Sequence, residues 1–371
     1  MLEACGLEES AMVCLSVRTG WDLYLRALGL AVGDEVLASA ITHPDMACIA
    51  RGHGLRVVPV DLDPGTLAPS VRGLEAARTD RTRIVLVAHL FGGRVDLGPI
   101  VRFAEDNGLL LVEDCAQAFT GPREMGHPGA DACLYSFGTL KTATALGGAV
   151  VTVRDPAMLA RMRRIGDGYT RQTRRSYALR LLKAAALHLA GNPRLYGRLI
   201  SLGANFQDAL GRAARSFPAD GTVDELLTAI RRRPSAPLLA LLARRLERFD
   251  YAALAARTFA GDGLSSRLGP GIVRPGRGAI SPTHWLFPVL VEDPDRLVRD
   301  LRRGGFDASR ATSSIAALRS PDECPRADGA ASIMERIVFL PAYPSLPEAA
   351  LDGLAAAVDR IAAPSTRKVC S

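Results

Sequence analysis

The feature of this sequence that most restricts its fold is the alternation of short apolar runs with helix-like segments between residues 33 and 113. The apolar runs are GDEVLASA, LRVVPVDLD, RIVLVAHL and LLLVED, and the segments between them are PDMACIARGHG, SVRGLEAART and GPIVRFAEDNG. Short strands that are apolar throughout and joined by helices are typical of a parallel sheet with both faces covered. The alternation therefore predicts an α/β fold built on a doubly wound, mainly parallel sheet.

Polar side chains stand where two of these runs end. His43 and Asp114 both fall at predicted strand ends, and ligands of such sheets bind outside the carboxyl ends of the strands. Glu113 and Asp114 directly follow an apolar run, so we expect at least one carboxylate at this edge. Two interpretations stay open for it: an N-cap of the next helix, or a fixed anion that keeps the ring nitrogen of a cofactor protonated.

The pattern changes twice further along the chain. Residues 155–217 are mostly helix-like, and LLALLARRLERFDYAALAARTFA predicts one long amphipathic helix that links two domains. Residues 275–371 are typical of a small α+β unit. We therefore predict a large α/β domain at residues 1–245, with a helical excursion at about 170–217, and a small C-terminal α+β domain at residues 246–371.

Lysine is scarce in this chain. The sequence has 46 Lys and Arg residues, and only Lys141, Lys183 and Lys368 are Lys. Lys141 follows a strand predicted at 131–136 and precedes one predicted at 149–153. An amine can condense with an aldehyde to form a Schiff base, whereas a guanidinium group cannot. Lys141 is therefore the candidate catalytic residue, and a chance lysine on a loop is the alternative.

The net charge is +7 and comes from Arg residues scattered along the chain. Aromatic residues make up only 5% of the sequence and do not alternate with the Arg clusters, which argues against a nucleic-acid surface. The positive charge suits anionic small-molecule substrates such as nucleotides.

The seven Cys residues are odd in number and show neither a CxxC motif nor a metal-ligand spacing with His. They predict free thiols in a reducing cytoplasm and no metal site. The sequence has no signal-peptide pattern and no apolar run of 18 residues, so we expect a cytoplasmic protein. The segment 178–206 is basic and apolar and lacks acidic residues. It could contact a membrane surface or cover an apolar substrate, but a helical insertion on the protein surface is the favoured interpretation.

Several motifs occur in an order that adds a stronger signal than any one of them. They are SVRTGWDLYLRALGL, GDEVLASAITHPDMA, VDLDPGTLAP, VAHLFGG, VEDCAQAF, YSFGTLKTATALGGAVVT and LPAYPSLPEAAL. With these motifs the chain resembles the DegT/StrS family of pyridoxal-phosphate sugar aminotransferases over roughly residues 16–363. The resemblance implies the type I aminotransferase fold and the cofactor pyridoxal 5'-phosphate.

The resemblance also implies roles for single residues. Lys141 would carry the cofactor and move a proton, Asp114 would pair with its ring nitrogen, and Gln117 would lie near its 3'-oxygen. His43 would stack on the ring. The remaining cofactor-binding residues would hold the phosphate: Ser136, the backbone around Val17, Arg18 and Thr19, and, reaching across a homodimer, Arg231.

The function implied by the resemblance is amino transfer from an amino acid donor, with glutamate as the expected donor, to a keto substrate, with a keto-sugar nucleotide as the family expectation. The chain departs from the family pattern at Val17, Arg18, Thr142 and Leu146, and these changes affect the expected substrate most. Three alternatives remain open: a lipid or natural-product ketone as substrate, a dehydration reaction on the same fold, and a non-catalytic scaffold.

Overall fold

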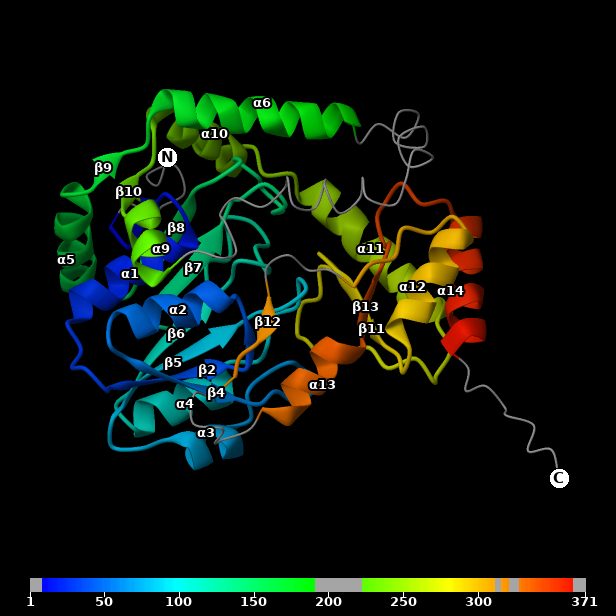
Figure 1. Ribbon diagram of the computed structural model, residues 1–371, viewed down its shortest axis with the longest axis horizontal. Coiled ribbons are helices and arrows are strands. Elements are labelled where there is room, and N and C mark those ends of the chain that lie inside the picture. The colour runs from blue at the N-terminus through cyan, green and yellow to red at the C-terminus, as the bar shows by residue number, and fades with distance from the viewer. Residues whose placement is uncertain (1–8, 191–221, 311–314, 320–326, 363–371) are drawn as a thin grey trace.

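A computed structural model describes residues 9–190, 222–310, 315–319 and 327–362. Within these residues the largest element is a seven-stranded sheet in the order β1-β8-β7-β6-β5-β2-β4 (Figure 1). Its strands are β1 (Ala11–Cys14), β2 (Glu35–Ser39), β4 (Arg56–Val60), β5 (Thr82–Ala88), β6 (Leu110–Asp114), β7 (Ala132–Ser136) and β8 (Ala149–Val153). β8 runs antiparallel to both of its neighbours, and the other neighbouring pairs are parallel. The predicted mainly parallel sheet is confirmed.

Helices cover both faces of this sheet, because its strands alternate buried apolar side chains toward two cores. One core joins the sheet to α1 (Val17–Leu28), α2 (Pro44–Gly52), α5 (Pro156–Asp167) and α9 (Val223–Ile230). The other joins it to α3 (Val71–Ala77), α4 (Gly98–Asp106) and α10 (Ala236–Glu247). Residues next to each other on one strand face opposite cores, as in β5, where Leu86 belongs to the first core and Val87 to the second. The sheet is thus doubly wound.

The first long helix has clear start and stop signals. Ser16 is its N-cap, and the Ser16 hydroxyl accepts a hydrogen bond from the backbone N–H of Thr19 at 3.3 Å. Gly29 ends the helix in the left-handed conformation, with φ at 63°. These two residues fix the ends of α1. The charge of Arg18, in its first turn, acts on Lys141, so this end of the helix faces the loop that carries Lys141.

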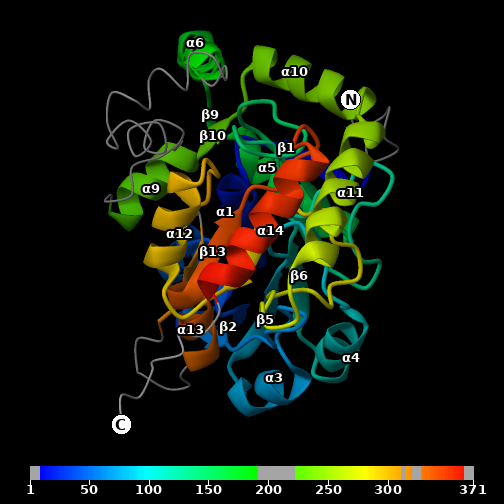
Figure 2. The ribbon, with the colours of Figure 1, turned by 90° about the vertical axis from the view of Figure 1, so that its right-hand side faces the viewer.

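The C-terminal part has its own apolar core. β11 (Phe287–Leu290) pairs antiparallel with β13 (Ile337–Leu340), and these strands pack with α11 (Tyr251–Arg267), α12 (Pro294–Arg303) and α14 (Glu348–Ala362). Figure 2 shows this part in front of the large sheet. α13 (Asp328–Arg336) lies between the two parts, in a further core shared with the loops after β4 and β5. The division into domains at residues 245 and 246 stays a prediction.

One sequence prediction about the linking helix was wrong. Residues 238–260 are not one helix, because α10 ends at Glu247 and α11 begins at Tyr251. Asp250 ends the continuity, since its carboxylate caps α11 by accepting from the backbone N–H of Ala253 at 2.8 Å. The break allows α10 to pack on the large sheet and α11 on the C-terminal core.

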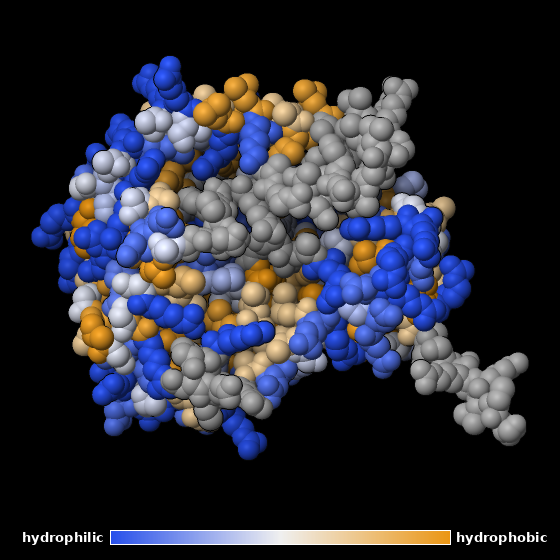
Figure 3. Space-filling view, in the orientation of Figure 1, coloured by the Kyte–Doolittle hydropathy of each residue, from blue (hydrophilic) through white to orange (hydrophobic). Residues whose placement is uncertain are grey.

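The predicted helical excursion is only partly described. α6 (Arg174–Ala190) contacts α10, and residues 191–221 lie outside the described residues. Figure 3 shows apolar side chains along this helix at the top of the molecule, and Leu179, Leu182 and Leu189 are each about two-thirds exposed. The described residues contain no helix long and apolar enough to cross a bilayer. Two short pairs complete the described strands: β3 (Ile41–Thr42) with β12 (Ala316–Ala317), and β9 (Thr170–Arg171) with β10 (Arg232–Arg233).

Candidate active site

Side chains from four segments meet beyond the carboxyl ends of the parallel strands. Asp114 ends β6, His43 follows β3, Arg18 begins α1, and Lys141 lies in the loop between β7 and β8. The charges of these groups act on one another: Asp114 and Arg18 shift the pKa of Lys141, and Arg18 and Lys141 shift the pKa of His43. The structure therefore brings four of the predicted site residues into one site, at the sheet edge where ligands bind.

The Lys141 amine is held in a largely buried position. Burial lowers the pKa of Lys141 to about 8, and the charge of Arg18 lowers it too, while Asp114 acts in the opposite direction. Its Nζ lies 4.4 Å from the centre of the Trp285 ring, within the range of a cation–π contact. A lysine in this state has a substantial neutral fraction at neutral to mildly alkaline pH, which is what a nucleophilic amine requires.

The Asp114 carboxylate is buried, and within the described residues only one of its two oxygens accepts a hydrogen bond. Its Oδ1 accepts from the backbone N–H of Ala116 at 3.0 Å, and no other hydrogen bond to this carboxylate is present in the described part of the chain. Burial raises the pKa of Asp114, and the Ala116 hydrogen bond and the Lys141 charge lower it. A second oxygen thus remains for a protonated ring nitrogen.

Gln117 lies one turn beyond Asp114 and is fixed by the neighbouring strand. Its Oε1 accepts from the backbone N–H of Phe91, after β5, at 2.9 Å. This bond orients the amide, so that its nitrogen stays a donor for a ligand oxygen. The predicted contact of Gln117 with a cofactor oxygen stays a prediction.

His43 is neutral at physiological pH, because burial, followed by the charges of Arg18 and Lys141, lowers its pKa to about 3. Its Nδ1 lies 3.1 Å from the backbone N–H of Asp45, and its Nε2 lies 3.0 Å from Arg18 Nη2. Both neighbouring groups are hydrogen-bond donors. A neutral imidazole has only one acceptor nitrogen, so His43 accepts a hydrogen bond from one of them only. Arg18 is held in place by its ion pair with Asp45, at 2.5 Å.

Three of the predicted phosphate-binding residues, Val17, Arg18 and Thr19, form the first turn of α1, and Ser136 lies at the end of β7. Val17 is the first helical residue, so the helix presents N–H groups of its first turn at this end. Thr19 is buried, and its hydroxyl donates to the backbone oxygen of Ile230 at 2.8 Å, so only its backbone could serve a phosphate. Ser136 ends β7 and its hydroxyl has no hydrogen bond within the described residues. That hydroxyl is available to a ligand.

Arg231 takes part in a network within its own chain. Its Nε and Nη2 donate to the two oxygens of Asp22 at 3.1 and 2.9 Å. Asp22 also contacts His53 at 2.9 Å and Tyr169 at 2.8 Å. The predicted reach of Arg231 to the phosphate of a partner subunit stays a prediction, and it would require these donors to leave Asp22 or to be shared.

Two residues of the site were missed in the sequence. Trp285 covers Lys141, and its indole N–H donates to the backbone oxygen of Leu140 at 2.9 Å. Arg257 on α11 contacts the Thr142 hydroxyl at 3.3 Å with both terminal nitrogens. The segment HWLFPVLVED gave the only signal for the first, since it brings one of the chain's two Trp residues to the start of a strand.

A buried polar cluster lies beside Asp114. Nitrogen, oxygen and sulfur atoms of His89, Glu113 and Cys115 lie within 4.8 Å of one another, which is a metal-like grouping. The backbone N–H of Val95 donates to His89 Nδ1, so Nε2 carries the proton and donates to Glu113 at 3.0 Å. Glu113 also accepts from Cys133 and from the backbone of His127. The polar groups of the cluster are thus satisfied by hydrogen bonds within the protein, and these bonds link β6 to β7 and to the segment that follows β5.

The donor set fits pyridoxal phosphate. The site offers a buried amine for the aldehyde, a buried carboxylate oxygen without a hydrogen bond within the described residues for the ring nitrogen, and a helix start with the Ser136 hydroxyl for the phosphate. The chemistry of these three protein groups thus matches the aldehyde, the ring nitrogen and the phosphate of the cofactor.

A protein-family model, that of the DegT/DnrJ/EryC1/StrS aminotransferase family, matches residues 3–191, about half of the chain. Among curated proteins the chain is 38% identical over 157 residues to L-glutamine:2-deoxy-scyllo-inosose aminotransferase of Streptomyces fradiae, which covers 40% of this chain and 36% of that protein. It is 33% identical over 162 residues to GDP-perosamine synthase of Caulobacter vibrioides, which covers 43% of each. The matches span 36 to 44% of the length of the curated relatives.

Solved structures resemble the chain over nearly its whole length. The aminotransferase TlmJ of Streptoalloteichus hindustanus matches 97% of this chain and 88% of its own, with a TM-score of 0.69 and 20% sequence identity. At this identity the likeness shows the fold alone. It confirms the predicted fold, a large doubly wound sheet with a smaller C-terminal part, as that of the type I aminotransferases.

Proposed function

Because the chain belongs to the DegT/DnrJ/EryC1/StrS aminotransferase family, we propose that it transfers an amino group from an amino acid to a keto-sugar. Members of this family use pyridoxal phosphate, and the donor set beyond the strand ends suits it. One observation carries the proposal: Lys141, whose pKa burial lowers to about 8, lies under the influence of the Asp114 carboxylate. An amine that is neutral in part and an acid fixed nearby are the two groups that this chemistry needs.

Each residue of the site has its own role in the proposed reaction. Bound pyridoxal phosphate supplies an electron sink for the bonds at the carbon that bears the amino group. Lys141 is placed to bind its aldehyde and, when released, to take and return a proton at that carbon. Asp114 holds the proton on the ring nitrogen, and the start of α1 with Ser136 binds the phosphate. His43, being neutral, presents an uncharged ring at the site.

The proposed substrates follow from the relatives and the charge. Of the two relatives described above, one is named as an aminotransferase of 2-deoxy-scyllo-inosose and the other as a synthase of GDP-perosamine. The net charge of +7 favours an anionic substrate such as a sugar nucleotide. We propose glutamate as the amino donor.

The test is the location of the cofactor on the chain. The purified protein is incubated with pyridoxal phosphate and reduced with borohydride, and its peptides are analysed by mass spectrometry. We expect the added mass on the peptide that holds Lys141, its loss in Lys141→Ala, and no change in Lys183→Ala, whose lysine lies exposed on α6. In a separate assay without borohydride, glutamate should give 2-oxoglutarate with the unchanged protein and with Lys183→Ala, but not with Lys141→Ala. An adduct on another residue, or none, would contradict the proposal.

A second candidate substrate is a lipid or natural-product ketone, and the exposed leucines of α6 favour it. Leu179, Leu182 and Leu189 lie on a helix that has Arg and Lys but no acidic residue. Such a helix suits an apolar or lipid-linked substrate. Activity that is unaffected when these three residues are changed to Gln would dispose of this candidate.

Three coarser features are part of the same proposal. We propose a homodimer, as the family resemblance implies, and sedimentation velocity would test it. We propose a cytoplasmic location, supported by the free thiols of Cys14, Cys48, Cys115 and Cys133 among the described residues. The division into residues 1–245 and 246–371 is proposed as well, and the separate core of the C-terminal part supports it.

A further inference from the structure

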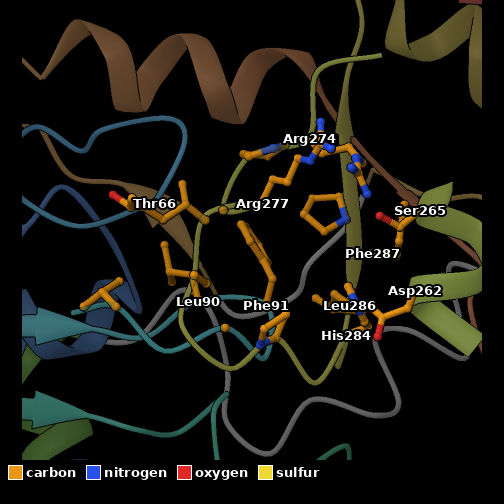
Figure 4. A pocket seen from close by; sticks show the side chains of 18 residues that line it. Thr66, Leu90, Phe91, Asp262, Ser265, Arg274, Arg277, His284, Leu286 and Phe287 are labelled. Atoms are coloured by element: carbon orange, nitrogen blue, oxygen red, sulfur yellow. Dashed lines mark hydrogen bonds and ion pairs between the residues drawn. The ribbon is translucent and has the colours of Figure 1, made fainter. Parts of the chain in front are cut away.

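A cavity lies between the loops that follow β4 and β5 and the C-terminal part. It has a volume of about 100 Å³ and is lined from the segments 66–67, 90–95, 262–265 and 274–288. Figure 4 shows Arg274 and Arg277 at its upper end, Leu90, Phe91 and Leu286 below them, and Asp262 and His284 at the lower right. For comparison, an apolar cavity of ~150 Å³ can hold benzene. The enclosed space is smaller than that, so it suits part of a small organic molecule whose remainder extends through the open side of the cavity.

The walls of this cavity are joined by backbone hydrogen bonds. The N–H of Gly276 donates to the oxygen of Pro64 at 2.9 Å, and the N–H of Gly278 donates to the oxygen of Gly65 at 2.8 Å. On the other side, the N–H of Leu286 donates to the oxygen of Phe91 at 3.1 Å. The segment 274–288 is thus fastened at both ends to the loops of the large sheet, and fixed backbone borders the cavity on two sides.

Unusual backbone conformations concentrate in the same place. Among the described residues other than Gly, only Leu67, Phe91, His284 and Leu146 have a positive φ. The first three, at 59°, 59° and 46°, all line this cavity. Bulky residues rarely adopt this conformation, and such strain persists mostly at ligand-binding and catalytic sites. Three strained residues around one cavity indicate a binding site.

The guanidinium groups of the two arginines at its upper end have free donors. Within the described residues the side chains of Arg274 and Arg277 make no hydrogen bond and no ion pair. Burial, followed by the charge of Arg277, lowers the pKa of Arg274, while Asp262 acts in the opposite direction. The Asp262 carboxylate itself is paired with His284 Nε2 at 2.9 Å. Two adjacent guanidinium groups with free donors form a receptor for a carboxylate or a phosphate.

We propose that this cavity binds a small organic anion, with its carboxylate or phosphate on Arg274 and Arg277 and its carbon skeleton against Leu90, Phe91 and Leu286. The site is separate from the Lys141 amine but connected to it. His284 lines the cavity, and the next residue, Trp285, covers the amine at 4.4 Å. A bound molecule that contacts His284 therefore changes the position of Trp285 and, through Trp285, the environment of the Lys141 amine.

The test uses the full-length protein loaded with pyridoxal phosphate. Binding of 4-fluorobenzoate is followed by ¹⁹F NMR, and the neutral 4-fluorobenzamide serves as the probe of the same shape without charge. We expect saturable binding of the acid and at least tenfold weaker binding of the amide. Arg274→Gln and Arg277→Gln should each weaken binding of the acid about tenfold, the usual effect of losing a charged hydrogen bond. Arg299→Gln on α12 is the matched control, because Arg299 is exposed and does not line the cavity, and it should bind like the unchanged protein.

Further arms identify the anionic group and the place. Phenyl phosphate carries more charge and should bind more tightly than benzoate, whereas the reverse order would assign the site to carboxylates. Ser265→Phe should fill the cavity and abolish binding, and binding should shift the Trp fluorescence. Unchanged binding in both arginine variants would overturn the proposal, and so would competition between 4-fluorobenzoate and pyridoxal phosphate for the protein without cofactor. Neither result depends on whether the proposed amino transfer occurs.

Discussion

The Nζ of Lys141 lies 4.4 Å from the centre of the Trp285 ring, and the indole N–H of Trp285 donates to the backbone oxygen of Leu140, the residue before that lysine. The indole is thus tied to the loop that it covers. A flat apolar ring over the amine excludes water, and exclusion of water is the main reason for the lowered pKa of Lys141. This pair joins the C-terminal part of the chain to the chemistry of the large sheet.

The first prediction concerns the pH dependence of cofactor uptake. Burial lowers the pKa of Lys141 to about 8, so the neutral, reactive fraction of the amine decreases as the pH falls below 8 and becomes the major form above it. The rate at which the protein without cofactor takes up pyridoxal phosphate should rise about tenfold per pH unit below 8 and level off above it. Absorbance measurements of the adduct between pH 6 and 10 would check this. A rate that keeps rising up to pH 10 would contradict this prediction, because it would show that the amine has the pKa of a lysine exposed to water.

The second prediction separates the roles of Asp114. Its negative charge raises the pKa of Lys141, so Asp114→Asn should move the midpoint of cofactor uptake below pH 8. The same change removes the partner of the ring nitrogen, so formation of 2-oxoglutarate from glutamate should fall at least tenfold although the cofactor still binds. Asp80→Asn, at an exposed position, is the matched control. Equal activity in both variants would exclude Asp114 from this role.

A glycine beneath the indole gives a third prediction. Gly92 has φ at 93°, and a Cβ there would lie 2.6 Å from the backbone nitrogen of Trp285. Gly92→Ala should therefore displace Trp285 and raise the pKa of Lys141 toward its usual value, visible as a shift of both Trp fluorescence and the pH profile. Gly29→Ala is a suitable control, because Gly29 also has a positive φ but a Cβ there meets no atom within 4 Å. It should cost about 1–2 kcal/mol of stability and leave the fluorescence unchanged.

Much of this arrangement could be predicted from the sequence because it depends on local pattern. Apolar runs between helix-like segments gave the strands β2, β4, β5 and β6, and the scarcity of lysine pointed to Lys141. Asp114 could be placed at the ligand edge because a carboxylate after an apolar strand has few other positions. These signals are short in range and repeat along the chain.

Contacts between distant segments could not be predicted in this way. Trp285 meets Lys141 across 144 residues, and nothing in the local sequence of either residue records the other. The break between α10 and α11 was missed because the apolar period continues through Asp250, whose capping bond decides the boundary. The strained Leu67, Phe91 and His284 carry no sequence signal, since such conformations are imposed by packing.

The last prediction concerns the buried ion pair of α1 with the segment after α9. The Asp22 side chain is fully buried and receives hydrogen bonds from His53, Arg231 and Tyr169. Burial raises the pKa of Asp22, but these hydrogen bonds outweigh burial and bring it to about 2. Because the pKa is lower in the folded than in the unfolded chain, the stabilisation is complete above about pH 4 and is lost as the pH falls toward 2.

Replacement of this carboxylate should therefore destabilise the protein at neutral pH and flatten its acid dependence. We expect Asp22→Asn to lower the free energy of unfolding by about 3 kcal/mol at pH 7, at the low end for a buried pair because Arg231 is partly exposed and can reach water. Asp352→Asn removes an exposed partner of Arg267 and should cost less than about 1 kcal/mol. Urea unfolding followed by circular dichroism at pH 7, 4 and 3 would measure both. Equal losses in the two variants, or an unchanged acid dependence in Asp22→Asn, would show that this network does not stabilise α1.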